Sequence, residues 1–173
     1  LLGSDSTPSL YKTTDGGASW TPQLTTGFQT VGSSFLNGVH FFDANVGLAY
    51  GDPLGTDFEI YRTTDGGDNW TQVPGSALPN PLTGEYGYNN TPIAVGNSLW
   101  ITTNKGYLYR TNDKGLTWTK SQAPLTDFGS AAQSGTVIFS SETNGALLKK
   151  IGTAYTLYTT SNGGTTWSTG IPF

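Results

Sequence analysis

Two stretches of the sequence carry side chains suited to holding a ligand: Asp52, Asp57, Glu85, Tyr86 and Tyr88. Tyrosine rings beside a carboxylate can stack on a sugar and hydrogen-bond its hydroxyl groups. The stretch 74–92 is rich in turn-forming residues and longer than most connections, which is typical of a functional loop. We expect a ligand-binding surface here. The alternative is that the tyrosines anchor the long loop and the carboxylates lie in a solvated turn.

The sequence offers little for catalytic chemistry. Cysteine is absent, which excludes thiol nucleophiles, zinc fingers and disulfides, and one histidine, His40, cannot build a histidine-rich metal site. A sialidase needs an arginine cluster for the carboxylate of its substrate, and this chain has only Arg62 and Arg110. Other glycosidases need two carboxylates about 5 to 9.5 Å apart. No spacing selects such a pair among Asp43, Asp52, Asp57, Glu85, Asp127 and Glu142. We therefore assign no catalytic residue and favour a non-enzymatic role.

A metal or cofactor site is not expected either. Asp43 and Asn45 resemble the start of a calcium loop, but Leu54 occupies the twelfth position, where a bidentate glutamate belongs. The stretch is better explained as a structural turn.

Composition limits the partners. Only 12% of the 173 residues are charged, against about a quarter in ordinary domains, and the net charge is -4. The longest cluster of basic residues is the pair Lys149-Lys150, so nucleic acid and anionic lipid are not expected as partners. No apolar run approaches the roughly 20 residues that cross a bilayer, so we expect no membrane insertion.

Four copies of one segment organise the chain. They read LYKTTDGGASW, IYRTTDGGDNW, LYRTNDKGLTW and LYTTSNGGTTW, and their tryptophans lie 50, 48 and 49 residues apart. A repeat of about 49 residues is typical of four-stranded propeller blades. In each copy a strand ends at threonine, and a polar side chain then closes a turn by accepting hydrogen bonds from amides two or three residues on. A glycine permits positive φ, and we expect the tryptophan that follows to be buried.

This pattern, Ser/Thr-x-Asp-x-Gly-x-x-Trp, resembles the Asp-box, or bacterial neuraminidase repeat. The resemblance implies an all-β fold, a β-propeller of four-stranded antiparallel blades, in which the Asp-box joins the third and fourth strands away from the ligand-binding face. It implies a structural role for the repeat residues. These are Thr13, Asp15, Gly17 and Trp20, then Thr63, Asp65, Gly67 and Trp70, then Thr111, Asp113, Gly115 and Trp118, and finally Thr160, Asn162, Gly164 and Trp167.

A second signature lies in the stretch 38–53, which reads GVHFFDANVGLAYGDP. Two apolar segments around a polar turn are expected for the first two strands of a blade. The stretch resembles the Phe-x-Asp-x-x-x-Gly-x-Ala-x-Gly pattern of propellers related to the photosystem II assembly and stability factor, a family also common in secreted bacterial proteins.

We expect one partial propeller domain of about three and a half blades over residues 1–173. Its parts are the outer half of a blade plus a connection (1–34), a blade (35–73), a long loop (74–91), a blade (92–120), a connection (121–135) and a blade (136–173). Closed propellers typically have about four to eight blades. The open sheet edges must therefore be covered, either by the remainder of a parent propeller or by another chain.

We interpret the chain as a non-catalytic binding or scaffolding module of a secreted or cell-surface, and thus extracytoplasmic, bacterial protein. Its inter-blade loops would bind a protein or a glycan. One alternative is part of a sialidase- or xyloglucanase-like glycoside hydrolase, with catalytic residues partly outside this chain. The resemblance to the photosystem factor implies a second alternative, an assembly factor for a membrane protein complex. A hydrolase should show further carboxylates or arginines on one face, whereas an assembly factor should be a single propeller.

Overall fold

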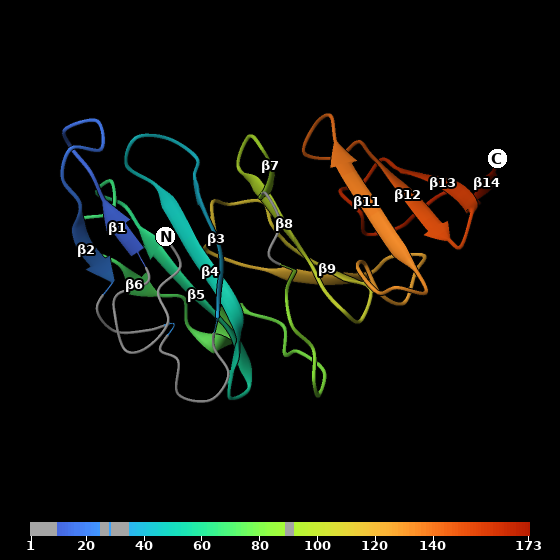
Figure 1. Cartoon of the computed structure of the whole chain (residues 1–173), viewed down its shortest axis with the longest axis horizontal. Helices are drawn as coiled ribbons and strands as arrows, with labels where there is room; N and C mark the ends of the chain where they lie inside the picture. Colours follow the sequence, from blue (N-terminus) through green and yellow to red (C-terminus); the bar gives the residue numbers. More distant parts are fainter. Residues whose placement is uncertain (1–9, 25–27, 29–34, 89–91) are drawn as a thin grey trace.

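The computed structural model describes residues 10–24, 28, 35–88 and 92–173. They form one two-stranded and three four-stranded antiparallel sheets, called blades 1 to 4 here, in which consecutive strands lie side by side (Figure 1). Blade 1 holds β1 (Leu10–Lys12) and β2 (Thr21–Leu24), and blade 2 holds β3 (Leu36–Phe41), β4 (Gly47–Leu54), β5 (Asp57–Thr63) and β6 (Thr71–Gln72). Blade 3 holds β7 (Ile93–Val95), β8 (Ser98–Thr102), β9 (Tyr107–Thr111) and β10 (Thr119–Gln122). Blade 4 holds β11 (Ser134–Phe139), β12 (Gly145–Ile151), β13 (Ala154–Thr160) and β14 (Ile171–Pro172).

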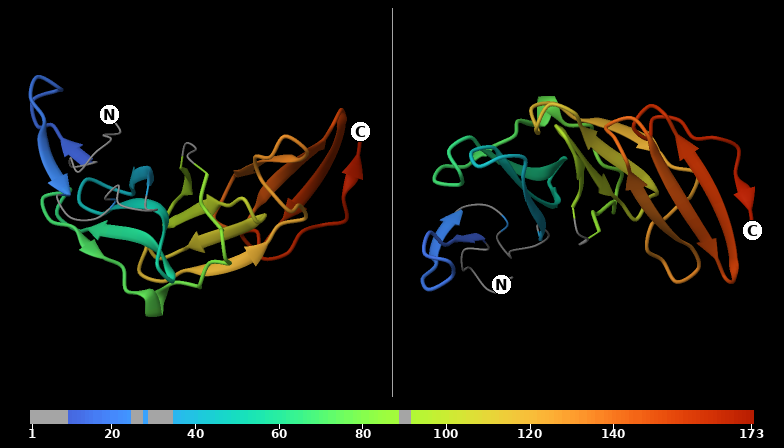
Figure 2. Two further views of the ribbon diagram at one scale, coloured as in Figure 1. Left: turned by 60° about the horizontal axis from the view of Figure 1, so that its bottom comes forward. Right: turned by 90° about the horizontal axis from the view of Figure 1, so that it is seen from above.

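The four blades follow one another in an open arc, with blade 1 and blade 4 at its two ends (Figure 2). Helical structure in the described ranges is limited to one 3₁₀ turn, η1 (Gly75–Ala77). Within those ranges no helix has the length and apolar composition needed to span a bilayer. The predicted all-β fold, a partial propeller of four-stranded blades, is confirmed.

The core lies between neighbouring blades. Successive side chains of a strand point to opposite faces of its sheet, so the second strand of an inner blade serves two interfaces. On β4, Leu48 and Tyr50 join the cluster shared with blade 3, whereas Ala49 joins the cluster shared with blade 1. All five residues of β8 are buried. Between blades 3 and 4 the Trp100 ring stacks on Phe139, with the ring centroids 3.8 Å apart.

Four matching hairpin turns, residues 13–20, 63–70, 111–118 and 160–167, connect the last two strands of each blade, and we call them the repeat turns. In each, the threonine Oγ1 accepts a hydrogen bond of 2.8 to 3.0 Å from the glycine amide four residues on. The Asp or Asn side chain accepts one of 2.9 Å from the amide four residues on, farther than the two or three predicted. The side chain bonds an amide farther along the chain because the turn contains two successive residues with left-handed backbone conformation, with φ of 56° to 72° and then 88° to 96°.

Burial of the repeat-turn tryptophans varies along the arc. Trp118 is only 6% exposed, Trp70 and Trp167 are half-buried, and Trp20 is 57% exposed. Each of the first three packs into the cluster that its blade shares with the preceding blade. The prediction of a buried tryptophan is wrong for Trp20, because the described residues contain no blade on that side of blade 1.

The connections lie at two opposite ends of the blades. The repeat turns share one end with the loops between the first two strands of each blade, as the hydrogen bond of 2.8 Å from the Gly66 amide to the Asn45 carbonyl shows. We call this end the turn face. The other end, the loop face, carries the β4–β5 connection and the long loop that follows β6, both at the bottom of Figure 1.

Candidate functional site

A groove of about 660 Å³ opens on the loop face between the β4–β5 connection and the loop 80–86. Three of the five predicted ligand residues, Asp52, Glu85 and Tyr86, line it, whereas Asp57 and Tyr88 are not among its lining residues. The rest of the lining comes from Pro53, Gly55, Thr56, Asn80, Pro81, Leu82, Thr83 and Gly84.

Asp52 supplies the groove with an acceptor. Its Oδ1 accepts hydrogen bonds from Asn37 Nδ2 at 2.8 Å and from the Gly87 amide at 3.1 Å. Among the described residues, none donates a hydrogen bond to Oδ2. Burial raises the pKa of Asp52 above its ordinary value, and the two hydrogen bonds oppose that shift. The two hydrogen bonds to Oδ1 therefore hold the carboxylate in place at the groove.

Glu85 lies deeper than the sequence suggested, since its side chain is fully buried. Oε2 accepts from Lys120 Nζ at 2.8 Å and from the Leu82 amide at 2.7 Å, and Oε1 accepts from Thr103 Oγ1 at 2.8 Å. Tyr109 donates a longer bond of 3.2 Å to Oε2. With both oxygens occupied, Glu85 anchors the long loop to blade 3 and offers no free acceptor to a ligand.

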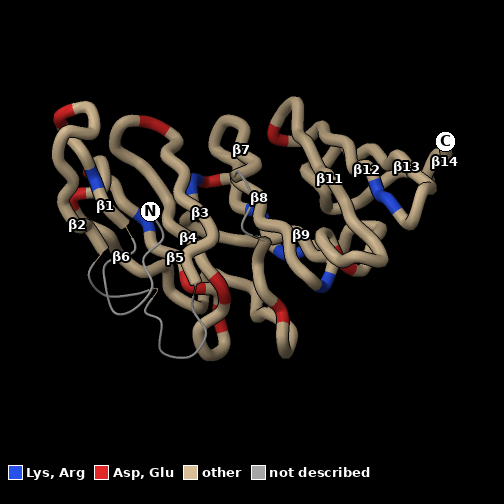
Figure 3. Tube along the Cα trace, in the orientation of Figure 1, with Lys and Arg blue, Asp and Glu red and all other residues tan. Residues whose placement is uncertain are grey.

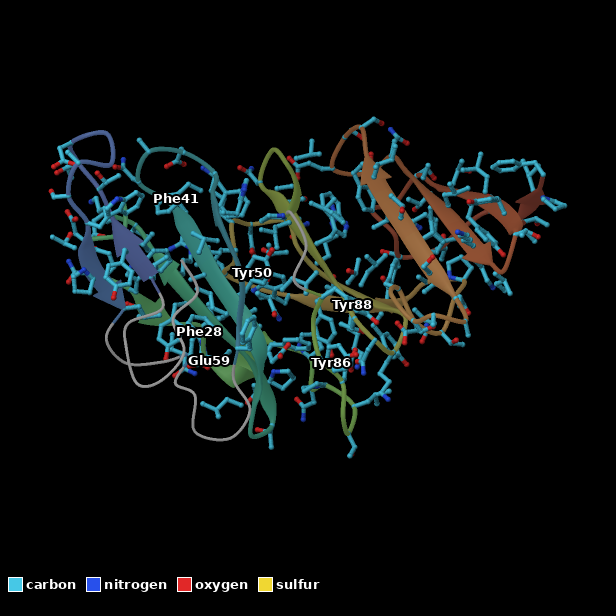
Figure 4. All side chains as sticks on the ribbon, viewed as in Figure 1. Phe28, Phe41, Tyr50, Glu59, Tyr86 and Tyr88 are labelled. Atoms are coloured by element: carbon cyan, nitrogen blue, oxygen red, sulfur yellow. The ribbon has the colours of Figure 1, made fainter. Side chains whose placement is uncertain are left out.

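The two tyrosines have different surroundings (Figure 4). Tyr86 is 45% exposed, while Tyr88 is half-buried and donates its hydroxyl to Asp127 Oδ1 at 2.5 Å. Their rings meet edge to face with centroids 5.7 Å apart. Burial, followed by the hydrogen bond to Asp127, raises the pKa of Tyr88. Tyr88 thus supports Tyr86, whose ring is accessible from the groove.

Asp57 lies on the other side of the β4–β5 connection. Its Oδ2 accepts a hydrogen bond of 3.0 Å from Thr56 Oγ1, and a side chain added at Gly75 would collide with its carboxylate. It lines a smaller cavity of about 190 Å³ with Pro74 and Gly75. The structure therefore separates Asp57 from the groove that Asp52 and Tyr86 share.

Acidic residues gather on the loop face below β4 and β5 (Figure 3). One of them, Glu59, escaped sequence reasoning because it sits inside a strand; it is 1% exposed. Its Oε1 accepts from the Phe28 amide at 3.0 Å and from Tyr61 at 3.1 Å. Asn37, which orients Asp52, was missed for the same reason: a single asparagine in an apolar strand gives no sign of its partner.

Two further residues considered from the sequence, His40 and Asp43, contact neighbouring side chains of the fold. Burial lowers the pKa of His40, whose ring meets Phe42 edge to face at 4.8 Å. Asp43 accepts a hydrogen bond of 2.6 Å from Lys114 Nζ and two more from amides of its own turn, and these bonds lower its pKa to about 2. No group of three metal-ligating side chains occurs in the described part of the chain.

An arc of one two-stranded and three four-stranded blades, with repeat turns at one end and a groove at the other, defines a propeller module of the BNR type. The sequence matches the family described as Photosynthesis system II assembly factor YCF48 over residues 1–136, and the chain belongs to this family. No curated protein matches the sequence.

Two solved structures are similar to the chain. A structure titled "YCF48 bound to D1 peptide" aligns with a TM-score of 0.52 and 20% sequence identity, over 78% of this chain and 39% of its own. YCF48 from Cyanidioschyzon merolae aligns with a TM-score of 0.49 and 18% identity, over 78% and 36%. At 20% identity the first likeness establishes the fold alone. This chain spans 39% of the length of that relative.

The family assignment corrects one expectation. A secreted or cell-surface location was predicted from the wider distribution of such propellers, and this prediction is wrong, because the family is one of photosystem II assembly factors. The comparisons give no support to carbohydrate binding.

Proposed function

We propose that the chain is part of an assembly-factor propeller that binds an extended peptide segment of a partner protein in the groove of the loop face. The observation that carries the proposal is the carboxylate of Asp52, whose Oδ2 accepts no hydrogen bond from the described residues, in the same groove as the exposed ring of Tyr86. A groove of about 660 Å³ is in the range of ligand sites in proteins. The family match and the peptide-bound relative support a peptide over a glycan.

A peptide offers what these groups can recognise. Its backbone amides, or a lysine or arginine side chain, can donate a hydrogen bond to Asp52 Oδ2. An apolar side chain can pack against the exposed surfaces of Tyr86 and Leu82. Glu85 adds little net charge, since Lys120 neutralises it. We propose that Tyr88 supports the site and that Asp57 lies beside it, in the smaller cavity on the other side of the β4–β5 connection.

We also propose that the repeat turns are Asp-boxes with a structural role. Their threonine and glycine groups, and the aspartate or asparagine between them, are engaged in hydrogen bonds within the turn, at the end of the blades opposite the groove. The rest of the ring would be supplied by the remainder of a parent propeller or by another chain.

Calorimetric titration with a synthetic D1 peptide tests the peptide proposal. We expect binding, and we expect Asp52→Asn and Tyr86→Ala each to weaken it about tenfold, equivalent to about 1.4 kcal/mol. Tyr11→Ala is the matched control, because Tyr11 is also exposed but lies on β1 of blade 1, outside the groove lining. Absence of binding, or equal weakening by the control, would contradict the proposal.

A further inference from the structure

The part of the chain that forms the groove contains few basic residues. Between Lys12 and Lys105 the sequence holds one lysine or arginine, namely Arg62, against eight acidic residues. The eight are Asp15, Asp43, Asp52, Asp57, Glu59, Asp65, Asp68 and Glu85. Arg62 lies away from the groove, since its Nε donates a hydrogen bond to the Lys114 carbonyl in a repeat turn, on the turn face. The residues outside the described ranges contain no lysine or arginine.

The basic side chain that blade 3 contributes near the groove is already paired. Lys120 Nζ lies 2.8 Å from Glu85 Oε2 and 4.1 Å from the centroid of the Tyr107 ring. The two other ion pairs of the described residues involve repeat turns, at the opposite end of the blades (Figure 3). Lys105, on the β8–β9 connection, is not among the lining residues of the groove. Asp52 therefore has no counter-ion within the described part of the chain.

The carboxylate and the aromatic ring of the groove are fixed close together (Figure 4). Asp52 Oδ1 accepts a hydrogen bond of 3.1 Å from the amide of Gly87, the residue that follows Tyr86. Asn104 Oδ1 accepts one of 2.8 Å from the Tyr86 amide, and the Tyr86 ring packs edge to face on Tyr88. Because the surroundings already hold both groups, a ligand that contacts them orders little of the protein.

A lysine or arginine side chain matches these two groups. Its charged head can pair with the Asp52 carboxylate while its methylene stem lies along the Tyr86 ring, whose face attracts the same charge. Burial raises the pKa of Asp52, and a poorly solvated carboxylate gains more from a nearby cation than an exposed one does. A backbone amide would supply a hydrogen bond but leave the charge without a counter-ion. Leu82, 49% exposed in the groove lining, offers a contact to an apolar neighbour in the ligand.

We propose that the groove selects partner segments in which a lysine or arginine stands beside an apolar residue. This inference rests on the proposed binding of a peptide at the loop face and assigns the specificity of that site. The cation pairs with Asp52 over the Tyr86 ring, and the apolar side chain packs against Leu82. An acidic segment is rejected, because it would bring a second negative charge to Asp52, and the described lining residues include no lysine or arginine to meet it.

Panning a phage-displayed library of random peptides against the chain separates specificity from binding itself. Peptides that bind wild type and not Tyr86→Ala are ligands of the groove, and circular dichroism checks that the variant is folded. We expect these peptides to be enriched in lysine or arginine beside an apolar residue. Groove ligands without a basic residue would overturn the inference and leave peptide binding intact. A library that yields no Tyr86-dependent peptide would contradict the proposed function, and the inference with it.

Calorimetric titration with one selected peptide then locates the charge. The basic residue of the peptide is replaced by an uncharged analogue, Nε-acetyl-lysine or citrulline. We expect this replacement to weaken binding to wild type about tenfold and to change binding to Asp52→Asn less than about twofold. Asp52→Asn removes the charge with little disturbance, because an asparagine Oδ1 can still accept the hydrogen bonds from Asn37 and Gly87.

Asp57→Asn is the matched control. It removes the same charge from the same β4–β5 connection, outside the groove lining. We expect it to weaken binding of the selected peptide less than about twofold, since solvent and salt screen a charge that the ligand does not contact. Equal weakening by Asp57→Asn and Asp52→Asn would overturn the inference, because the overall charge of the loop face would then select the ligand. An effect of the uncharged analogue that persists in Asp52→Asn would overturn it as well.

Discussion

The carboxylates illustrate how surroundings decide what a residue does. Glu85 and Asp52 line the same groove, yet Lys120, Thr103 and two further donors saturate Glu85, whereas Oδ2 of Asp52 accepts no hydrogen bond from the part of the chain that the structure describes. A buried carboxylate without partners would be expensive, and the hydrogen bonds to both oxygens of Glu85 offset the cost of its deep burial. Availability to a ligand is thus a property of the hydrogen-bonding environment and not of the residue type.

Asp65 in the second repeat turn provides a test by pH. Hydrogen bonds, first from the Asn69 side chain, lower its pKa from 3.8 to about 2. Because the folded-state pKa lies below the unfolded one, the carboxylate contributes stability that is present above about pH 4 and lost as pH falls to about 2. We expect the free energy of unfolding of Asp65→Asn, measured by urea denaturation across this pH range, to fall less steeply with pH than that of the wild type. Asn162→Asp is the reciprocal control and should steepen it; equal acid sensitivity in all three proteins would contradict the assignment.

At the scale of the elements, the repeat turns of blades 2, 3 and 4 each contact the blade before them. Arg62 and Arg110 occupy the same place on successive third strands, and both reach into the following blade. Sequence reasoning excluded them from a sialidase cluster without finding this role. Their position just before the repeat threonine places them on the blade face that the next turn covers.

The tryptophans test this dependence on the preceding blade. Trp118 lies in the core between blades 2 and 3, so we expect Trp118→Ala to lower the free energy of unfolding by about 3 to 5 kcal/mol through the cavity it leaves. Trp20→Ala removes the same side chain from an exposed site and should cost less than about 1 kcal/mol. Urea denaturation of the two variants measures both values. Similar losses would mean that the tryptophan stabilises its own hairpin and not the interface.

Repetition explains why the elements were predictable and the site was not. Four copies of one segment at a near-constant period predicted the strands and turns, because local propensity and spacing agree at each copy. The saturation of Glu85 depends on Thr103 and Lys120, which are 18 and 35 residues away. Such pairings arise only when blades pack, and a single sequence holds no pattern for them. The prediction of a buried Trp20 failed for a related reason, since burial is set by a neighbouring blade.

On the scale of the whole molecule, the stability of the arc is approximately the sum of the stabilities of the single blades and of the interfaces between adjacent blades. In repeat architectures each unit contacts only the adjacent units, so units at the ends are held from one side. Blade 3 is covered on both faces and all of β8 is buried. Blade 4 leaves Ile138, Ile151 and Ile171 exposed by more than half.

Native-state hydrogen exchange should reveal this gradient. We expect amides of β8 and β9 to exchange only on global unfolding, and those of β12 and β13 to exchange through a local opening of lower free energy. Uniform protection across both pairs of strands would show that the blades unfold as one cooperative unit.

The direction of inter-blade packing also matters during synthesis. The repeat turns of blades 2, 3 and 4 each rest on the blade that precedes them in the chain, so the supporting face leaves the ribosome before the hairpin that will cover it. A nascent chain can therefore add blades one by one onto a surface that is already folded. Each newly finished blade exposes the face that the next hairpin will cover only until that hairpin emerges, which keeps the interval of exposure to roughly the time needed to translate one repeat.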